Sequence, residues 1–176
     1  MNRPKQSPGC VLCRAEARRV NALRPALEKL GVKLVCLVHE WLKTEIGAFK
    51  PKFWSGELYL DKNKDMYRAL GAGKVHKQSW IRFFCCCLCT LGPKYSEAKA
   101  IAPDSEPNVN GTHMVMGGYM VLKQGTKGVQ WQFQEDFFGD HPAYDKLLEE
   151  CQKAGSQKLT EQEGKQAKAD REDEDS

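Results

Sequence analysis

Two cysteines near the start of the chain carry the clearest chemical signal in the sequence. Cys10 and Cys13 are separated by two residues, a spacing that closes a small disulfide where the backbone turns, as in the first turn of a helix. A helical pattern follows directly, and the N-terminus of a helix stabilises a thiolate through its partial positive charge and free N–H groups. The spacing predicts a redox site in which Cys10 is the attacking thiolate and Cys13 the resolving thiol.

Neighbouring residues are expected to tune and enclose this pair. Arg14 places a cation beside the thiols, and a lower thiol pKa raises the fraction that attacks disulfides or peroxides. Gly9 precedes the pair directly. Gly117 and Gly118 allow two interpretations: they are plain turn glycines, or they lack a Cβ so that the backbone can approach the disulfide closely.

Two other interpretations of the cysteine pair stay open. The spacing can arise by chance at the start of a structural helix. It can also be half of a zinc site, because Cys86 and Cys89 form a second pair with the same spacing. The gap between Cys13 and Cys86, residues 14–85, is far longer than in common zinc modules, so no metal site is predicted.

Composition limits the class of protein. The chain has 176 residues, of which 41% are hydrophobic, enough for the core of one domain. It has no run of 18 uncharged apolar residues, and residues 1–9 have no apolar stretch, so neither a spanning helix nor a secretory signal is expected. Eight cysteines without such a signal favour a reducing compartment, the cytoplasm. No nucleic-acid motif accompanies the net charge of +4.

Apolar periodicity gives the expected elements. A stripe over residues 11–30 predicts a helix that Pro25 kinks or locally breaks and that Gly31 ends. The apolar run 32–38 predicts a strand buried on both faces of a parallel sheet. The other expected helices are 40–49, 62–70 and 140–153, and the other expected strands are 57–60, 114–122 and 129–134, the last two joined as a hairpin. This order predicts an α/β domain over residues 1–155, with a central mixed sheet flanked by helices, and a disordered charged tail over 156–176.

The cysteine-rich segment 80–91 has two interpretations. Its apolar residues and four thiols fit reversible S-acylation at a membrane surface, which would give the protein a peripheral membrane contact. They equally fit a buried segment in which cysteine acts as a small hydrophobic residue.

Several blocks of the sequence resemble one known family. Residues 8–17, Pro-Gly-Cys-Val-Leu-Cys-Arg-Ala-Glu-Ala, are similar to the motif of the peroxiredoxin-like 2 proteins. These relatives of alkyl hydroperoxide reductase (AhpC/TSA) include selenoprotein U and prostamide/prostaglandin F synthase. Residues 56–61, 66–71, 117–122 and 138–140 fit further blocks of that family, so the resemblance covers residues 8–153.

The resemblance implies a thioredoxin-like fold and an antioxidant or reductase activity at Cys10 and Cys13. It implies no tightly bound cofactor, a dithiol donor such as thioredoxin that draws ultimately on NADPH, and a small peroxide as the substrate. In one branch of the family the substrate is instead a lipid endoperoxide. A non-enzymatic zinc-binding or redox-regulatory scaffold is the alternative outside enzymes.

The chain departs from the family in two places. The family has an apolar strand just before Pro8, and the polar residues 1–8 cannot supply it. We therefore expect a shortened chain or a sheet that lacks its usual first strand. Only Ser7 stands three residues before Cys10, so the threonine–arginine pocket with which true peroxiredoxins activate peroxide is not predicted.

Overall fold

The protein is described by a computed structural model over residues 10–79, 91–105, 115–125 and 128–155. It opens with two consecutive helices, α1 (Val11–Ala22) and α2 (Arg24–Lys29). The break falls at Leu23 because Pro25, in the first turn of α2, has no N–H to continue the α1 hydrogen-bond ladder. Gly31 ends α2 with a φ of 68°, a conformation that favours glycine. The predicted local break and the helix end are both confirmed.

A parallel strand pair follows. β1 (Val35–Val38) pairs with β2 (Glu57–Leu60), with Val35 opposite Glu57, and α3 (Lys43–Phe49) lies in the crossover between them. Parallel strands need such a crossover, and a helix usually supplies it. The prediction of a strand buried on both faces over 32–38 is wrong in part. β1 starts three residues later, at Val35, which is 40% exposed, and of its four residues only Val38 is fully buried.

An antiparallel hairpin forms the second strand pair. β3 (Gly118–Leu122) pairs with β4 (Val129–Gln134), as the turn residues between them predicted. The expected strand 114–122 is shorter in the structure, because Val115 makes only an isolated bridge with Lys77 before β3 begins.

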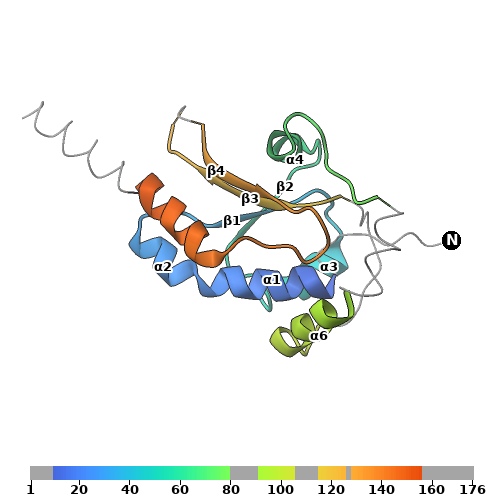
Figure 1. Cartoon of the computed structure of the whole chain (residues 1–176). Helices are drawn as coiled ribbons and strands as arrows, with labels where there is room; N and C mark the ends of the chain where they lie inside the picture. The colour runs from blue at the N-terminus through green and yellow to red at the C-terminus, as the bar shows by residue number, and fades with distance from the viewer. Residues whose placement is uncertain (1–9, 80–90, 106–114, 126–127, 156–176) are drawn as a thin grey trace, which may run out of the picture.

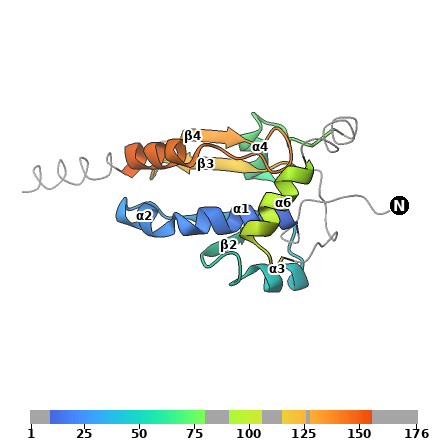
Figure 2. The same cartoon turned by 60° about the horizontal axis from the view of Figure 1, so that its bottom comes forward.

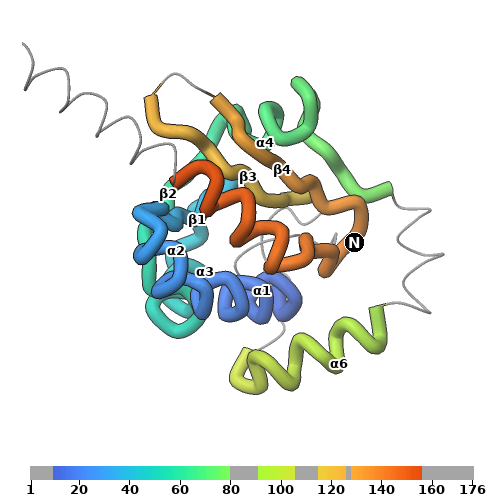
Figure 3. The backbone as a smooth tube through the Cα atoms, turned by 60° about the vertical axis from the view of Figure 1, so that its left-hand side comes forward, coloured from blue at the N-terminus to red at the C-terminus, as the bar shows by residue number. Residues whose placement is uncertain are grey.

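The helices cover the strands from two sides. Figure 1 shows α1, α2 and a helix over residues 144–155 on one side, and α4 (Asp65–Leu70) on the other. Figure 3 shows helix 144–155 running beside α1. One buried cluster joins α1 to Phe49 and Trp54, and a second joins Leu27 and Val121 to helix 144–155. Both clusters lie beside the N-terminal helices, so α1 is anchored along its length.

One helix has no counterpart in the sequence prediction. α6 (Gly92–Ile101) packs across α1 (Figure 2), where Arg18 donates to the Ile101 carbonyl at 3.0 Å. Ala98 is its only buried residue, so α6 carries no apolar stripe that a periodicity argument can detect.

Two predictions fall outside the described residues. One is that segment 80–91 is either acylated or buried, of which residues 80–90 are not described, and the other is the charged tail 156–176. In the part of the chain that the structure describes, no helix is both long and apolar enough to cross a membrane.

Candidate dithiol site

The two cysteines of the motif lie together at the start of α1. Cys10 has an extended backbone and caps the helix, and its carbonyl accepts the first helical hydrogen bond, from the N–H of Arg14 at 3.0 Å. Cys13 is in the first turn, so both sulfurs lie at the end of the helix that stabilises negative charge. Both thiols are free and partly buried.

The pair is electrostatically asymmetric. The Cys13 thiol donates a hydrogen bond to the Cys10 sulfur, and this contact is the main cause that lowers the pKa of Cys10. The backbone N–H groups of Cys13 and Leu12 lower it further, against the opposing effect of burial. The same hydrogen bond, together with burial, raises the pKa of Cys13 well above its ordinary value. Cys10 is therefore the group that ionises first, and Cys13 keeps its proton.

The side chain of Arg14 makes its contacts with α3 and the segment that follows it. Its guanidinium is buried, 3.4 Å from the carboxylate of Glu45 in α3 and 5.2 Å from the centre of the Phe53 ring. The groups that lower the pKa of Cys10 most are hydrogen-bond donors at Cys13 and Leu12. The support of the thiolate by Arg14 stays a prediction, and the contacts of Arg14 give it a structural role in holding α1 to α3.

The predicted glycines have separate outcomes. Gly9 lies outside the described residues. Gly117 and Gly118 line the same cavity as the thiols, but a Cβ on Gly118 would lie 2.1 Å from the Phe133 carbonyl in β4. The three atoms nearest a Cβ on Gly117 would belong to Glu135, at 3.8–3.9 Å. At Gly118, close approach to the neighbouring strand therefore requires glycine, and approach of these glycines to a disulfide stays a prediction.

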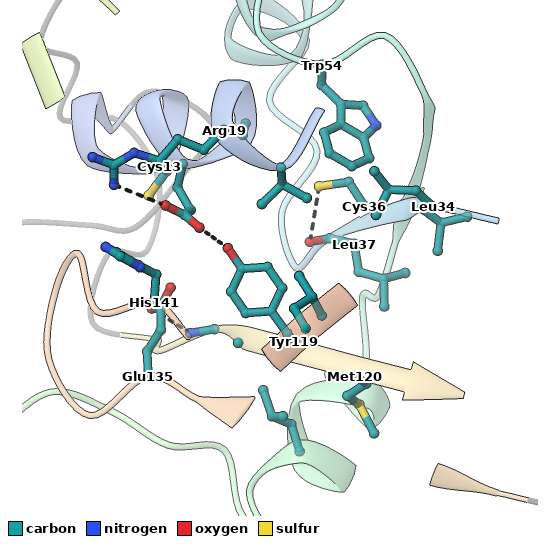
Figure 4. A pocket seen from close by; sticks show the side chains of 18 of the residues that line it. Cys13, Arg19, Leu34, Cys36, Leu37, Trp54, Tyr119, Met120, Glu135 and His141 are labelled. Atoms are coloured by element: carbon teal, nitrogen blue, oxygen red, sulfur yellow. Dashed lines mark hydrogen bonds and ion pairs between the residues drawn. The ribbon is translucent and has the colours of Figure 1, made fainter. Parts of the chain in front are cut away.

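Glu135 is a site residue that the sequence analysis missed. Its carboxylate accepts a hydrogen bond from the Gly117 N–H at 3.2 Å, and its charge raises the pKa of both Cys10 and Cys13. Figure 4 shows Glu135 and His141 on the strand side of the space that Cys13 faces. No local pattern marks Glu135, which directly follows β4, so only the fold brings it to the thiols.

A second missed group surrounds Glu16, one turn beyond Cys13. Its carboxylate accepts hydrogen bonds from the phenols of Tyr119 and Tyr144, the latter at 2.8 Å, and lies 3.5 Å from the Arg19 guanidinium. The pKa of Tyr119 is raised, first by burial and then by the Glu16 charge. The sequence signal was Glu16 itself, a charged residue one turn after the motif.

The thiols open into one large cavity of about 790 Å³. It extends from Cys10 and Cys13 between β1 and β3 to the far end of α2. In Figure 4, Tyr119 and Met120 of β3 and Leu34, Cys36 and Leu37 in and beside β1 border this space. The cavity gives the dithiol a predominantly apolar surrounding, with Glu16, Glu135 and His141 among its polar lining.

Outside the Cys10–Cys13 pair, we looked at the thiol of Cys36 and at groups of side chains that could bind a metal ion. Burial raises the pKa of Cys36 to about 12, so this thiol is protonated at neutral pH. Among residues 10–79, 91–105, 115–125 and 128–155, no three His, Cys, Asp or Glu side chains form a group able to hold a metal ion. The second cysteine pair, Cys86 and Cys89, lies outside these ranges.

Sequence comparison places the chain among known proteins. The family model described as AhpC/TSA antioxidant enzyme matches residues 19–136, a stretch that starts after Cys13. The chain is 32% identical over 151 residues to peroxiredoxin-like 2A of Bos taurus, 34% over 146 to that of Rattus norvegicus and 33% over 146 to that of Danio rerio. Each match covers 83% of this chain, and 62%, 59% and 64% of the respective relative. The chain thus spans about three fifths of these relatives. No solved structure matches significantly.

Proposed function

The chain belongs to the AhpC/TSA antioxidant enzyme family, and on that basis we propose that it is a thiol-dependent oxidoreductase that acts through Cys10 and Cys13. Its fold is the α/β thioredoxin-like fold of that family, as the sequence predicted. Its similarity to the peroxiredoxin-like 2A proteins agrees with the resemblance carried by residues 8–17. The observation that carries the proposal is the position of two free, partly buried thiols together at the start of α1, where their mutual contact lowers the pKa of Cys10 and raises that of Cys13.

The proposed reaction with a peroxide has two steps. The Cys10 thiolate attacks one peroxide oxygen, the O–O bond breaks, and the other oxygen leaves and takes up a proton. Cys10 is then a sulfenic acid. Cys13 gives up its proton and attacks the Cys10 sulfur, the S–O bond breaks, water leaves, and a Cys10–Cys13 disulfide remains. An external dithiol reduces this disulfide by exchange.

The same pair can act on two other bonds. With a disulfide substrate, Cys10 forms a mixed disulfide and Cys13 displaces the partner thiol. With a lipid endoperoxide, Cys10 bonds to one oxygen, the O–O bond breaks, and the other oxygen takes up a proton. Cys13 then attacks the Cys10 sulfur and breaks the S–O bond, so that the first oxygen also takes up a proton; two hydroxyl groups remain on one molecule and a Cys10–Cys13 disulfide on the protein. The predominantly apolar lining of the 790 Å³ cavity beside the thiols favours an apolar substrate. Comparing turnover of hydrogen peroxide, a lipid endoperoxide and a small disulfide identifies the class of substrate.

The proposal extends to the surroundings of the enzyme. A reducing compartment, the cytoplasm, keeps the eight cysteines available as thiols. A thioredoxin-type protein, recharged ultimately from NADPH, is the proposed electron donor, with no tightly bound cofactor. Peripheral membrane contact through segment 80–91 is proposed on the sequence of that segment alone.

The thiol state of the pair tests the central proposal. Mass spectrometry of the full chain before and after one equivalent of peroxide should show the mass loss of a disulfide joining Cys10 and Cys13, with Cys36 still alkylatable. Bound zinc is assayed on the same sample. A zinc-loaded protein, or a pair that stays reduced, would contradict the redox proposal and favour the scaffold alternative.

A further inference from the structure

The resolving step of the proposed reaction requires a proton acceptor. Cys13 keeps its proton at neutral pH, because the hydrogen bond to Cys10 and burial raise its pKa well above the ordinary value. A thiol attacks another sulfur as the thiolate. Once the Cys10 sulfur is bonded to substrate, it has lost its negative charge and no longer attracts this proton. A nearby base must therefore take the proton as Cys13 attacks.

The carboxylate of Glu135 is fixed where β3 begins and β4 ends. The N–H of Glu135 donates to the Gly117 carbonyl at 3.1 Å, and the Gly117 N–H donates back to the Glu135 carboxylate at 3.2 Å. The strand pair continues directly from there, with Gly118 opposite Gln134. These two hydrogen bonds hold both the backbone and the side chain of Glu135 on the strand side of the space that Cys13 faces (Figure 4).

The charge of Glu135 acts on the groups around this space. The hydrogen bond from Cys13 lowers the pKa of Cys10, whereas burial and the Glu135 charge oppose that effect. At Cys13, the hydrogen bond and burial raise the pKa, and the Glu135 charge raises it further. Burial raises the pKa of Tyr67 and Tyr119, and the same charge adds to both. Because the interaction between charges weakens with distance, the carboxylate lies close to both thiols.

This position has a disadvantage for the first step of the reaction. A negative charge beside the nucleophile opposes its ionisation, so a neutral side chain at residue 135 would make the Cys10 thiolate more abundant. A carboxylate is useful here only if a later step needs it. Resolution by Cys13 is such a step, because it releases a proton beside the Glu135 carboxylate.

Glu16, a second carboxylate of the site, is committed to other contacts. It accepts hydrogen bonds from the phenols of Tyr119 and Tyr144, the latter at 2.8 Å, and lies 3.5 Å from the Arg19 guanidinium. A proton taken up by Glu16 would displace a phenol and weaken an ion pair. These contacts give Glu16 a structural role in holding α1 to β3 and to helix 144–155.

We propose that Glu135 accepts the proton of Cys13 during the resolving step, an inference that rests on the proposed function. As the Cys13 sulfur bonds to the Cys10 sulfur, its proton passes to a carboxylate oxygen of Glu135, directly or through one water. The bond from Cys10 to the substrate breaks, the two cysteines are oxidised to the disulfide, and the substrate is reduced. A leaving oxygen takes the proton from Glu135, whereas after a leaving thiolate Glu135 returns the proton to solvent.

The variant Glu135→Gln separates proton transfer from hydrogen bonding. Its amide oxygen can still accept from the Gly117 N–H, while the base and its charge are lost. The reduced full chain is mixed with a small aromatic disulfide, and acid-quenched samples are analysed by mass spectrometry of the peptide that carries Cys10 and Cys13. The mixed disulfide reports on attack by Cys10, and its conversion to the Cys10–Cys13 disulfide reports on resolution.

The two steps should respond differently to Glu135→Gln. At neutral pH the conversion should slow by about 100-fold or more, while attack by Cys10 should be as fast or faster, because the opposing charge is gone. The conversion rate of the variant should rise about tenfold per pH unit, because hydroxide replaces the carboxylate as the base. In the unchanged chain it should vary little near neutral pH.

Two further variants serve as comparisons. Glu135→Asp keeps a carboxylate on a shorter side chain, so it should keep the weak pH dependence at a lower rate. Asp136→Asn removes the adjacent exposed charge and should change neither step.

Three results would contradict these expectations. Conversion at an unchanged or higher rate in Glu135→Gln would overturn the proposal, since loss of the charge alone favours ionisation of Cys13. Slowing of both steps together would also overturn it, and would give Glu135 a structural role at Gly117. If the unchanged chain formed neither the mixed disulfide nor the Cys10–Cys13 disulfide, the redox function itself would be refuted.

Discussion

The thiol of Cys13 donates a hydrogen bond to the sulfur of Cys10, and this contact is the largest cause of the lowered Cys10 pKa. A hydrogen bond to the charged form of a thiol favours that form, so the contact favours ionisation of Cys10. The helix N-terminus holds both residues, so the contact depends on the first turn of α1.

Replacing the donor should raise the pKa of Cys10. In Cys13→Ala the hydrogen bond is lost, whereas Cys13→Ser keeps an O–H donor at the same place. The pH midpoint of iodoacetamide alkylation at Cys10 should lie higher in Cys13→Ala than in Cys13→Ser, by about one pH unit, the effect of one hydrogen bond to a charged group. Equal midpoints in the two variants would show that the helix N-terminus alone sets the pKa.

The roles of the two thiols in turnover are separable. Cys10→Ser should abolish turnover, because a serine hydroxyl is not ionised at neutral pH. Cys13→Ser should leave Cys10 able to attack but unable to resolve, so mixed disulfides between Cys10 and a protein disulfide substrate should accumulate on non-reducing gels. Cys36→Ser serves as the control, since the raised pKa of Cys36 predicts unchanged turnover. Turnover by Cys10→Ser would refute the assignment of Cys10 as the nucleophile.

The buried pair of Arg14 and Glu45, with side chains 5% and 2% exposed, is expected to matter for stability. Glu45→Ala leaves the guanidinium buried without this carboxylate, at a cost of about 3–5 kcal/mol in the free energy of unfolding. The double variant Arg14→Met, Glu45→Leu should regain most of that loss in urea unfolding. In Arg14→Met, the pH midpoint of alkylation at Cys10 should shift less than in Cys13→Ala. A larger shift would show that the Arg14 charge stabilises the Cys10 thiolate.

Stability should decrease at alkaline pH. The folded state raises the pKa of Cys36 to about 12 and also raises that of Tyr119, in both cases chiefly through burial. These groups keep their protons when folded and lose them when unfolded, from about pH 8.5 for the thiol and about 10 for the phenol. The free energy of unfolding is therefore fully retained below those values and falls as pH rises above them.

Urea unfolding at several pH values from neutral to strongly alkaline checks this expectation. Cys36→Val removes one titrating group and keeps an apolar side chain, so its stability should fall less steeply than that of the unchanged chain once the pH exceeds about 8.5. A constant unfolding midpoint across this pH range would contradict the raised pKa values of Cys36 and Tyr119.

The hydrogen bonds of Glu16 give a further test. Tyr144→Phe removes a donor 2.8 Å from the carboxylate and should lower the free energy of unfolding by about 1.5–3 kcal/mol, the contribution of a hydrogen bond to a charged group. Thermal or urea unfolding measures it. Tyr95→Phe, in which the altered phenol is 40% exposed on α6, is the control and should change stability little.

The sequence by itself determined the features that depend on near neighbours. The dithiol at the start of a helix, the break at Pro25, the end at Gly31 and the strands 57–60 and 129–134 all follow from spacing, turn residues and local apolar patterns. These signals act within a few residues, so one chain read in order is enough to find them. The helix α6 was not predicted, because its packing buries a single alanine.

Only the tertiary structure decided which distant groups meet. Arg14 pairs with Glu45, 31 residues away, and Glu16 with Tyr144, 128 residues away; a charge or a phenol in the sequence does not specify its partner. The same holds for the cavity between β1 and β3. The two strands that line it are far apart along the chain, so the cavity emerged only once they were placed in space.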